Sequence, residues 1–304
     1  MAKAAGTGVR SVDLGVSDLA KASKFYQEIW GLDRVAERGG SLYLRGTGPA
    51  HHLVALHPRP KGELLRFDLT APDKAAVDAL HQQLAAAGLG AIEAPAALAE
   101  PGEGYGFAFR DPEGRNVRIL AGARTHAEVK DHPDKPRKIS HLVLNSRDAA
   151  GITDFYTRTL GFKVSDRTAM MTFIRCNSDH HSVAFVKSAH NTLHHIAFEM
   201  MDIDAVMRGG GRMRDAGFDI EWGIGRHGPG NNVFAYFLGP DEMVIEYTTE
   251  VEQVDDSYRT GGPEDWVWPP GRLDHWGVGV GPSERMRQAH DRVGFPASMF
   301  HPAG

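Results

Sequence analysis

Two histidines and one glutamate stand at positions in this sequence where they could share a metal ion. The residues are His141, His195 and Glu246, and each falls in a short alternation of apolar and polar residues that predicts a strand. Two imidazoles and a carboxylate from three separate strands form a facial set that leaves coordination positions open and favours Fe(II) or a neighbouring divalent metal. Alternation places His194, beside His195, on the opposite face of its strand. Sixteen histidines among 304 residues also point to metal or proton chemistry.

The elements that must position these residues come from a unit repeated four times. Each copy has a short strand, a polar residue, an amphipathic helix, and a glycine followed by a large apolar residue. The copies begin at Ser11, Arg66, His141 and His195, and their helices close at Gly31, Gly88, Gly161 and Gly217. An aspartate stands where each helix should begin, and a glycine in the left-handed conformation should end it. Short alternating runs after each helix complete a βαβββ unit.

The spacing of the closing glycines groups the units into two pairs. Consecutive glycines are 57, 73 and 56 residues apart, and the extra chain between the second and third units is rich in proline and charge, which predicts a linker. We expect an α+β fold of two tandem domains, each a pair of βαβββ units forming a curved, partly closed sheet with helices outside. The expected ranges are 1–122 for an N-terminal domain, 123–138 for the linker, 139–250 for a catalytic domain and 251–304 for a C-terminal tail.

The repeat predicts that only the second domain binds metal. Aligning the units and their last hairpins matches His141 with Ser11, His195 with Arg66, and Glu246 with Arg118. Arginine at two of the three positions repels a cation. The N-terminal domain is therefore expected to be a metal-free scaffold.

With these residues in place, the chain resembles the type I extradiol catechol dioxygenases of the vicinal oxygen chelate superfamily. The resemblance covers nearly the whole chain and rests on LHHIAF from Leu193, GRHG from Gly225 and YFLGPDEMVIEY from Tyr236. It implies the ligand set already predicted, with Fe(II) as the cofactor and Mn(II) as an alternative. It also implies an oxidoreductase that uses O2 to open a catechol-type substrate beside the diol, working as a homo-oligomer, a tetramer or larger.

The resemblance implies further active-site residues around the metal. The family's active-site histidine maps to His181, which would deliver a proton. A histidine of the GRHG loop maps to His227 and a tyrosine of the last hairpin maps to Tyr236, and both would bind the substrate oxygens. Tyr236 and Glu246 are equidistant from Asp241, which predicts that they face each other across the hairpin.

The C-terminal tail holds three tryptophans, Trp266, Trp268 and Trp276, among prolines and glycines. This composition is too aromatic for a disordered segment, and it predicts either packing against the second domain or a lid over the substrate. By the resemblance, Arg272 falls where members that cleave carboxylated catechols place a basic residue near the pocket. Trp222 stands where those members carry another arginine, which leaves the acidity of the substrate open.

Composition argues against several other classes of protein. Lys and Arg total 34 and Asp and Glu total 39, so the net charge of −5 gives no general attraction to nucleic acid or anionic lipid. Apolar runs are too short for a membrane span. Neither a leader nor a second cysteine beside Cys176 is seen, so we expect a cytoplasmic protein.

Two alternatives to a dioxygenase remain: a metal-dependent lyase or isomerase of the glyoxalase type, and a non-catalytic small-molecule-binding protein of the same fold.

Overall fold

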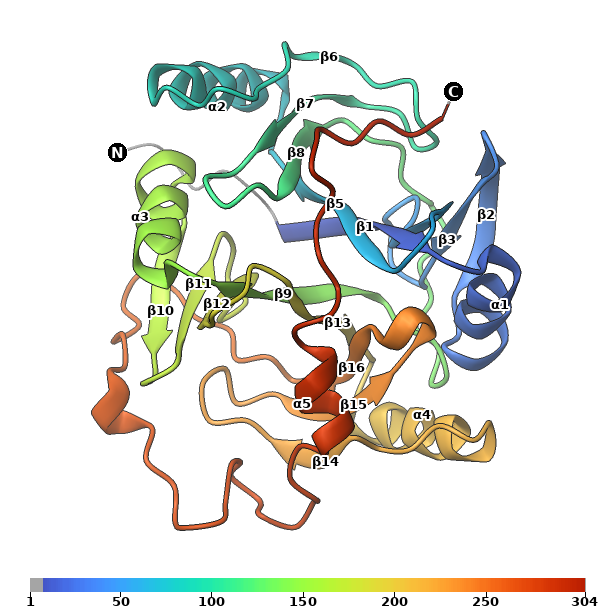
Figure 1. Cartoon of the computed structure of the whole chain (residues 1–304), viewed down its shortest axis with the longest axis vertical. Coiled ribbons are helices and arrows are strands. Elements are labelled where there is room, and N and C mark those ends of the chain that lie inside the picture. Colours follow the sequence, from blue (N-terminus) through green and yellow to red (C-terminus); the bar gives the residue numbers. More distant parts are fainter. Residues whose placement is uncertain (1–7, 304) are drawn as a thin grey trace.

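The computed structural model describes residues 8–303 and contains two eight-stranded sheets with one shared topology (Figure 1). The first sheet has the order β2-β3-β4-β1-β5-β8-β7-β6, and the second has the order β10-β11-β12-β9-β13-β16-β15-β14. Adding eight to each strand number of the first order gives the second. The expected α+β fold of two tandem domains built from βαβββ units is therefore confirmed.

The strands and helices have the following bounds. The first sheet contains β1 (Gly8–Val16), β2 (Asp33–Arg38), β3 (Ser41–Arg45), β4 (Val54–Pro58), β5 (Glu63–Thr70), β6 (Ala96–Ala97), β7 (Tyr105–Arg110) and β8 (Asn116–Ala121). The second contains β9 (Lys138–Ser146), β10 (Lys163–Arg167), β11 (Met171–Arg175), β12 (Val183–Lys187), β13 (Leu193–Glu199), β14 (Trp222–Arg226), β15 (Val233–Leu238) and β16 (Val244–Thr249). The helices are α1 (Leu19–Lys24) continued by η1 (Phe25–Ile29), α2 (Lys74–Ala86), α3 (Ala149–Leu160), α4 (Ile203–Asp215), η2 (Pro240–Glu242), η3 (Pro263–Asp265) and α5 (Glu284–Ala289).

Strand pairing within each unit differs from the pairing between successive units. The first strand of a unit runs parallel to its last strand, as β9 does beside β12 and β13 does beside β16. The first strands of two successive units then pair antiparallel, as β9 does with β13. A parallel pair needs a crossover connection, which here includes the helix. The helices α1 to α4 consequently lie at the periphery of the molecule (Figure 1).

The helix boundaries follow the predicted capping residues. The side chain of an aspartate before each helix accepts a hydrogen bond from the backbone amide three residues further on, at Asp18, Asp73, Asp148 and Asp202. The closing glycines have φ angles of 94°, 76°, 72° and 83°, at Gly31, Gly88, Gly161 and Gly217. These angles lie in the region that residues with a Cβ avoid. Local chemistry thus fixes where each crossover helix starts and stops.

The two domains are in contact where the end of η1 in the first domain meets the second sheet. The ring of Trp30 stacks on that of Tyr247, with centroids 3.7 Å apart, and the Tyr247 hydroxyl donates to the Trp30 carbonyl at 2.8 Å. A Cβ on Gly209 of α4 would lie 2.7 Å from the Tyr247 ring. The glycine run inside α4 therefore allows the helix to approach this ring, which a larger residue would push away.

The linker and the tail both connect the two domains. Residues 122–137 contain no helix or strand, and the backbone amide of Thr47 donates to the Pro136 carbonyl at 2.9 Å. After α5, the tail returns to the first domain, where the Leu64 amide donates to the Gly294 carbonyl at 3.1 Å and the Phe300 ring lies 5.3 Å from Cζ of Arg66 (Figure 1). No helix among residues 8–303 combines the length and apolar character that a membrane span requires.

Candidate metal centre and active site

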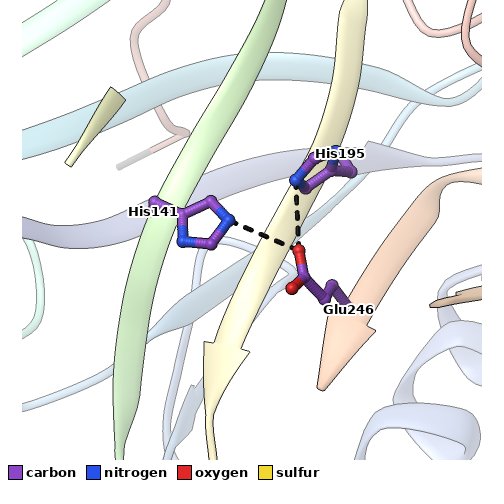
Figure 2. Close-up of side chains that lie close together, drawn as sticks. All are labelled: His141, His195 and Glu246. Atoms are coloured by element: carbon purple, nitrogen blue, oxygen red, sulfur yellow. Dashed lines mark ion pairs between the residues drawn. The ribbon is translucent and has the colours of Figure 1, made fainter. Parts of the chain in front are cut away.

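Three neighbouring strands at the centre of the second sheet carry the predicted metal ligands. His141 lies on β9, His195 on β13 and Glu246 on β16 (Figure 2). Ala197 of β13 pairs with His141 on one side and with Glu246 on the other. Because side chains alternate along a strand, this register brings the three ligands to one face around the small side chain of Ala197.

The three side chains converge on one point (Figure 2). Nε2 of His141 lies 3.3 Å from Oε2 of Glu246, and Nε2 of His195 lies 3.2 Å from the same oxygen. Two ligands at right angles, each ~2.1 Å from a metal, lie roughly 3.0 Å apart. The observed spacing is therefore close to that of neighbouring ligands on one ion.

Two of the converging atoms are buried without a hydrogen-bond partner. Among the described residues, no group with suitable hydrogen-bond geometry meets Nε2 of His195 or Oε2 of Glu246, although these two atoms lie 3.2 Å apart. A buried polar atom left without a partner costs free energy, so a ligand that satisfies both is expected at this point. Two imidazole nitrogens and a carboxylate suit a divalent metal such as Fe(II) or Mn(II), and the residues present fit such an ion.

The three further residues implied by the resemblance stand around this point. The ring centroid of His181 lies 4.2 Å from that of His141, and the ring centroid of Tyr236 lies 5.1 Å from that of His195. Nε2 of His227 lies 2.9 Å from the Tyr236 hydroxyl. Tyr236 also pairs with the glutamate ligand across the hairpin, as its spacing predicts. The structure therefore brings His181, His227 and Tyr236 together with the metal ligands.

Burial sets the protonation states of these side chains. Burial lowers the pKa of His181 well below its usual range and the pKa of His227 to about 4, so both imidazoles are neutral near pH 7. Burial also raises the pKa of the Tyr236 hydroxyl well above its usual value, so this group keeps its proton. Burial alone would raise the pKa of Glu246, but the two ligand imidazoles outweigh it and hold that pKa well below the usual range. The carboxylate is thus in the charged form that binds a metal.

His194 is a functional candidate that strand alternation placed wrongly. A β-bulge between Leu193 and His195 interrupts the alternation, and His194 lines the same cavity as His195. Nδ1 of His194 lies 2.7 Å from Nδ1 of His195, and the His194 ring stacks on His290 of the tail with centroids 3.5 Å apart. If Nε2 of His195 binds a metal, its Nδ1 carries the proton and donates to His194. This contact orients the His195 ring.

Two further residues, His180 and Asn232, support the side chains of this site. Nδ1 of His180 lies 3.1 Å from Nδ1 of His181, and Nε2 of His180 lies 2.8 Å from the Asp166 carboxylate. Asn232 donates from Nδ2 to Oε1 of Glu246 at 3.4 Å. The paired histidines at 180–181 and 194–195 were a visible signal in the sequence. Asn232 has no such signal, because its contact depends on how the loop before β15 folds over the site.

A cavity of about 370 Å³ opens onto the metal point. One end of the cavity is formed by His141, His181, His195, His227 and Tyr236. The remaining wall is largely apolar and includes Val143, Met171, Phe173, Trp222, Trp266 and Trp268. Two of the three tail tryptophans therefore line the cavity, a position compatible with both packing against the second domain and a lid over the substrate.

Arg272 is the predicted site residue that the structure does not bring to the cavity. Its guanidinium donates to the carbonyl of Asp274 at 3.3 Å and to the carbonyl of His275. It is not among the residues that line the cavity. The side chain thus holds a turn of the tail together.

Comparison with known proteins agrees with this fold. Residues 8–119 and 138–247 match the family described as Glyoxalase/Bleomycin resistance protein/Dioxygenase superfamily. These two matches cover both domains, so the chain belongs to this superfamily.

Individual relatives narrow the class further. Metapyrocatechase 2 of Cupriavidus necator is 31% identical over 230 residues, which cover 66% of this chain and 68% of the relative. Biphenyl-2,3-diol 1,2-dioxygenase of Sphingomonas paucimobilis is 25% identical, covering 92% of this chain and 91% of the relative. The crystal structure of the Mn(II)-bound glyoxalase from Novosphingobium aromaticivorans is 36% identical with a TM-score of 0.87, covering 98% of this chain and 97% of that one. The resemblance to extradiol dioxygenases of the vicinal oxygen chelate superfamily is therefore confirmed.

Proposed function

We propose that this enzyme, an extradiol ring-cleaving dioxygenase of catechol-type diols, works at a mononuclear Fe(II) held by His141, His195 and Glu246. The observation that carries the proposal is the convergence of three buried donor atoms, two of which lack a hydrogen-bond partner among the described residues. The two oxygens of a catechol could chelate a divalent metal held by these residues, and the charge of the metal would make loss of a phenolic proton easier. Mn(II) suits the same donors and is the alternative cofactor.

The chain's own side chains supply the proton chemistry in this proposal. His227 and the Tyr236 hydroxyl, 2.9 Å apart, form a hydrogen-bonded pair placed to bind a substrate oxygen. Nδ1 of His181 faces His180, which leaves Nε2 for the substrate side. As a neutral imidazole, His181 can accept a proton and return it during ring opening. The largely apolar wall of the cavity lowers the polarity around these transfers.

Oxygen uptake is the direct test of the proposed function. The purified protein is loaded anaerobically with Fe(II) or with Mn(II) and then mixed with oxygenated solutions of a panel of catechols. We expect oxygen consumption that matches the ring-opened, yellow product, and one metal ion per chain by elemental analysis. Absence of oxygen uptake with every catechol and both metals would contradict the proposal.

The glyoxalase-type lyase or isomerase remains the second candidate, because a Mn(II)-bound glyoxalase is 36% identical over nearly the whole chain. Such an enzyme would use the metal as a Lewis acid and would consume no oxygen. Such sites often draw ligands from paired modules, whereas the matched positions of the N-terminal domain hold Ser11, Arg66 and Arg118. This difference favours the dioxygenase. A non-catalytic binding protein, the third alternative, would retain no metal.

We also propose that the enzyme assembles as a homo-oligomer, a tetramer or larger, and that it works in the cytoplasm on a small-molecule diol and O2. Cys176 is buried and is the one cysteine of the chain, which is compatible with a reducing compartment. Light scattering on the purified protein tests the assembly. A mass equal to one chain would contradict it.

A further inference from the structure

None of the described side chains that line the substrate cavity carries a formal charge. The lining contains no Lys, Arg, Asp or Glu. Its polar groups gather at the metal end, in the histidines and Tyr236, with Thr168 as an exception. Away from that end the wall is apolar or aromatic, with Val143, Met170, Phe173, Trp266, Trp268 and Leu273.

The arginines that flank the cavity along the chain are engaged elsewhere. Arg272 donates to carbonyls of its own turn. Arg226 pairs with the Glu250 carboxylate at 2.5 Å, and Arg167 donates to the Thr172 hydroxyl at 3.1 Å. A carboxylate on the substrate would therefore enter an apolar space without a cation to pair with, which is costly.

The indoles of the tail pack directly on the loop that carries the catalytic histidine. A Cβ on Gly228 would lie 2.4 Å from Cζ2 of Trp268 and 3.0 Å from Cε3 of Trp266, so only a glycine lets both rings approach this backbone. Two other lining residues are left open to water: Met170 is 54% exposed and Leu273 is 51% exposed. Apolar side chains exposed beside a cavity are typical of a surface that a ligand covers.

On the basis of the proposed function, we infer that the substrate is a catechol bearing an uncharged aryl group or a comparably bulky apolar group, and that Trp266 and Trp268 bind this group. The cavity volume of about 370 Å³ lies within the roughly 300–1,000 Å³ typical of small-molecule sites, which leaves space beyond a single ring. An aryl group also gains offset or edge contacts with the indoles in addition to burial. A catechol carrying a carboxylate is selected against, because the wall offers it no partner.

The test compares phenylcatechol, catechol and dihydroxyphenylacetate as substrates of the metal-loaded enzyme. We expect kcat/KM to favour phenylcatechol over dihydroxyphenylacetate by about tenfold or more. Trp268→Ala should lower kcat/KM for phenylcatechol by about tenfold and change the value for unsubstituted catechol less than about threefold. Trp276→Ala is the matched control, since Trp276 belongs to the same tail but is 38% exposed and does not line the cavity. It should leave the preference unchanged.

A second variant keeps the inference testable if Trp268→Ala does not fold. Leu273→Arg places a cation on the exposed part of the wall and should shift the preference toward dihydroxyphenylacetate. A wild-type enzyme that cleaves dihydroxyphenylacetate as well as phenylcatechol would overturn the inference and leave the proposed function intact. If none of the three consumes oxygen, the proposed function fails, and anaerobic calorimetry on the Mn(II)-loaded protein decides the inference separately. Tighter binding of phenylcatechol supports it, and equal or tighter binding of dihydroxyphenylacetate overturns it.

Discussion

The two domains hold opposite charges at equivalent points of the same sheet. In the second domain, two imidazoles and a carboxylate surround Ala197, the residue that pairs with both β9 and β16. In the first domain, the matching residue is Asp68, which pairs with Ser11 on β1 and with Arg118 on β8. The register therefore supports the alignment of His141 with Ser11 and of Glu246 with Arg118 made from the repeat.

The buried charges of the first domain balance one another. The Ser11 hydroxyl donates to Asp68 at 2.9 Å, and Nε of Arg118 donates to the same carboxylate at 3.0 Å. Nε of Arg66 lies 3.3 Å from Asp68, and its Nη2 donates to Glu100 at 2.6 Å. In the first domain, a carboxylate surrounded by hydrogen-bond donors thus takes the place of the candidate metal position of the second domain, which is surrounded by acceptors. This comparison suggests that the centre of such a paired sheet must be charge-balanced, either by a bound cation or by an internal ion network.

The largest expected effect separates the two centres by their dependence on metal. His195→Ala removes one of three ligands, so we expect the variant to retain less than about one-tenth of the metal and to lose activity. Ser11→Ala changes the first-domain counterpart of a ligand and should retain metal at the wild-type level. Elemental analysis after gel filtration measures both. Stoichiometric iron in the His195 variant would show that the ligand assignment is wrong.

The next effect distinguishes catalysis from metal binding. His181→Ala should keep the metal but slow turnover by about 10²–10⁴-fold, because a positioned proton donor is lost. The matched variant is His52→Ala, since the His52 ring lies 5.1 Å from Tyr43 much as the His181 ring lies 5.2 Å from Phe173. His52→Ala should leave turnover per folded chain unchanged. Equal loss in both variants would indicate a structural role for these histidines.

A smaller effect, on stability, is expected from the ion network. Asp68→Ala removes one of the two carboxylates that the buried Arg66 and Arg118 share, the other being Glu100, and we expect the free energy of unfolding to fall by up to about 3–5 kcal/mol. Urea denaturation measures the change. Asp204→Ala, which removes an exposed pair with Arg208, should leave the midpoint unchanged. A midpoint for Asp68→Ala that matches the wild type would contradict the idea of a charge-balanced centre.

Much of the fold and of the site was predictable because it depends on local chemistry repeated four times. The capping aspartates, the left-handed glycines and the pairing of Tyr236 with Glu246 all follow from short-range spacing. The contacts of His194 were not predictable, because one bulge reverses strand alternation. The stacking of His290 on His194 joins residues 96 positions apart, and no periodic pattern encodes such a contact. Asp68 was likewise missed, since its importance appears only once the register is known.

The smallest expected effect concerns the His290 contact that joins the tail to β13. Burial, with a contribution from nearby His195, lowers the pKa of His290 to about 3. The unfolded chain takes up this proton near the ordinary value of about 6.5, whereas the folded chain resists it until about pH 3. The contribution to stability is thus complete above pH 6.5 and is lost as the pH falls through this window.

We therefore expect the free energy of unfolding to fall by up to about 1.4 kcal/mol per pH unit below pH 6 because of this one group. His290→Phe keeps an aromatic ring for stacking but cannot titrate, so its stability should decline less steeply. Urea denaturation of the two proteins between pH 7 and pH 5 measures the difference in slope. Because other buried histidines titrate in both proteins, only this difference reports on His290. Equal slopes would mean that His290 takes up its proton as readily in the folded chain as in the unfolded one. The tail would then be held to the second domain by its backbone hydrogen bonds instead of by this imidazole stack.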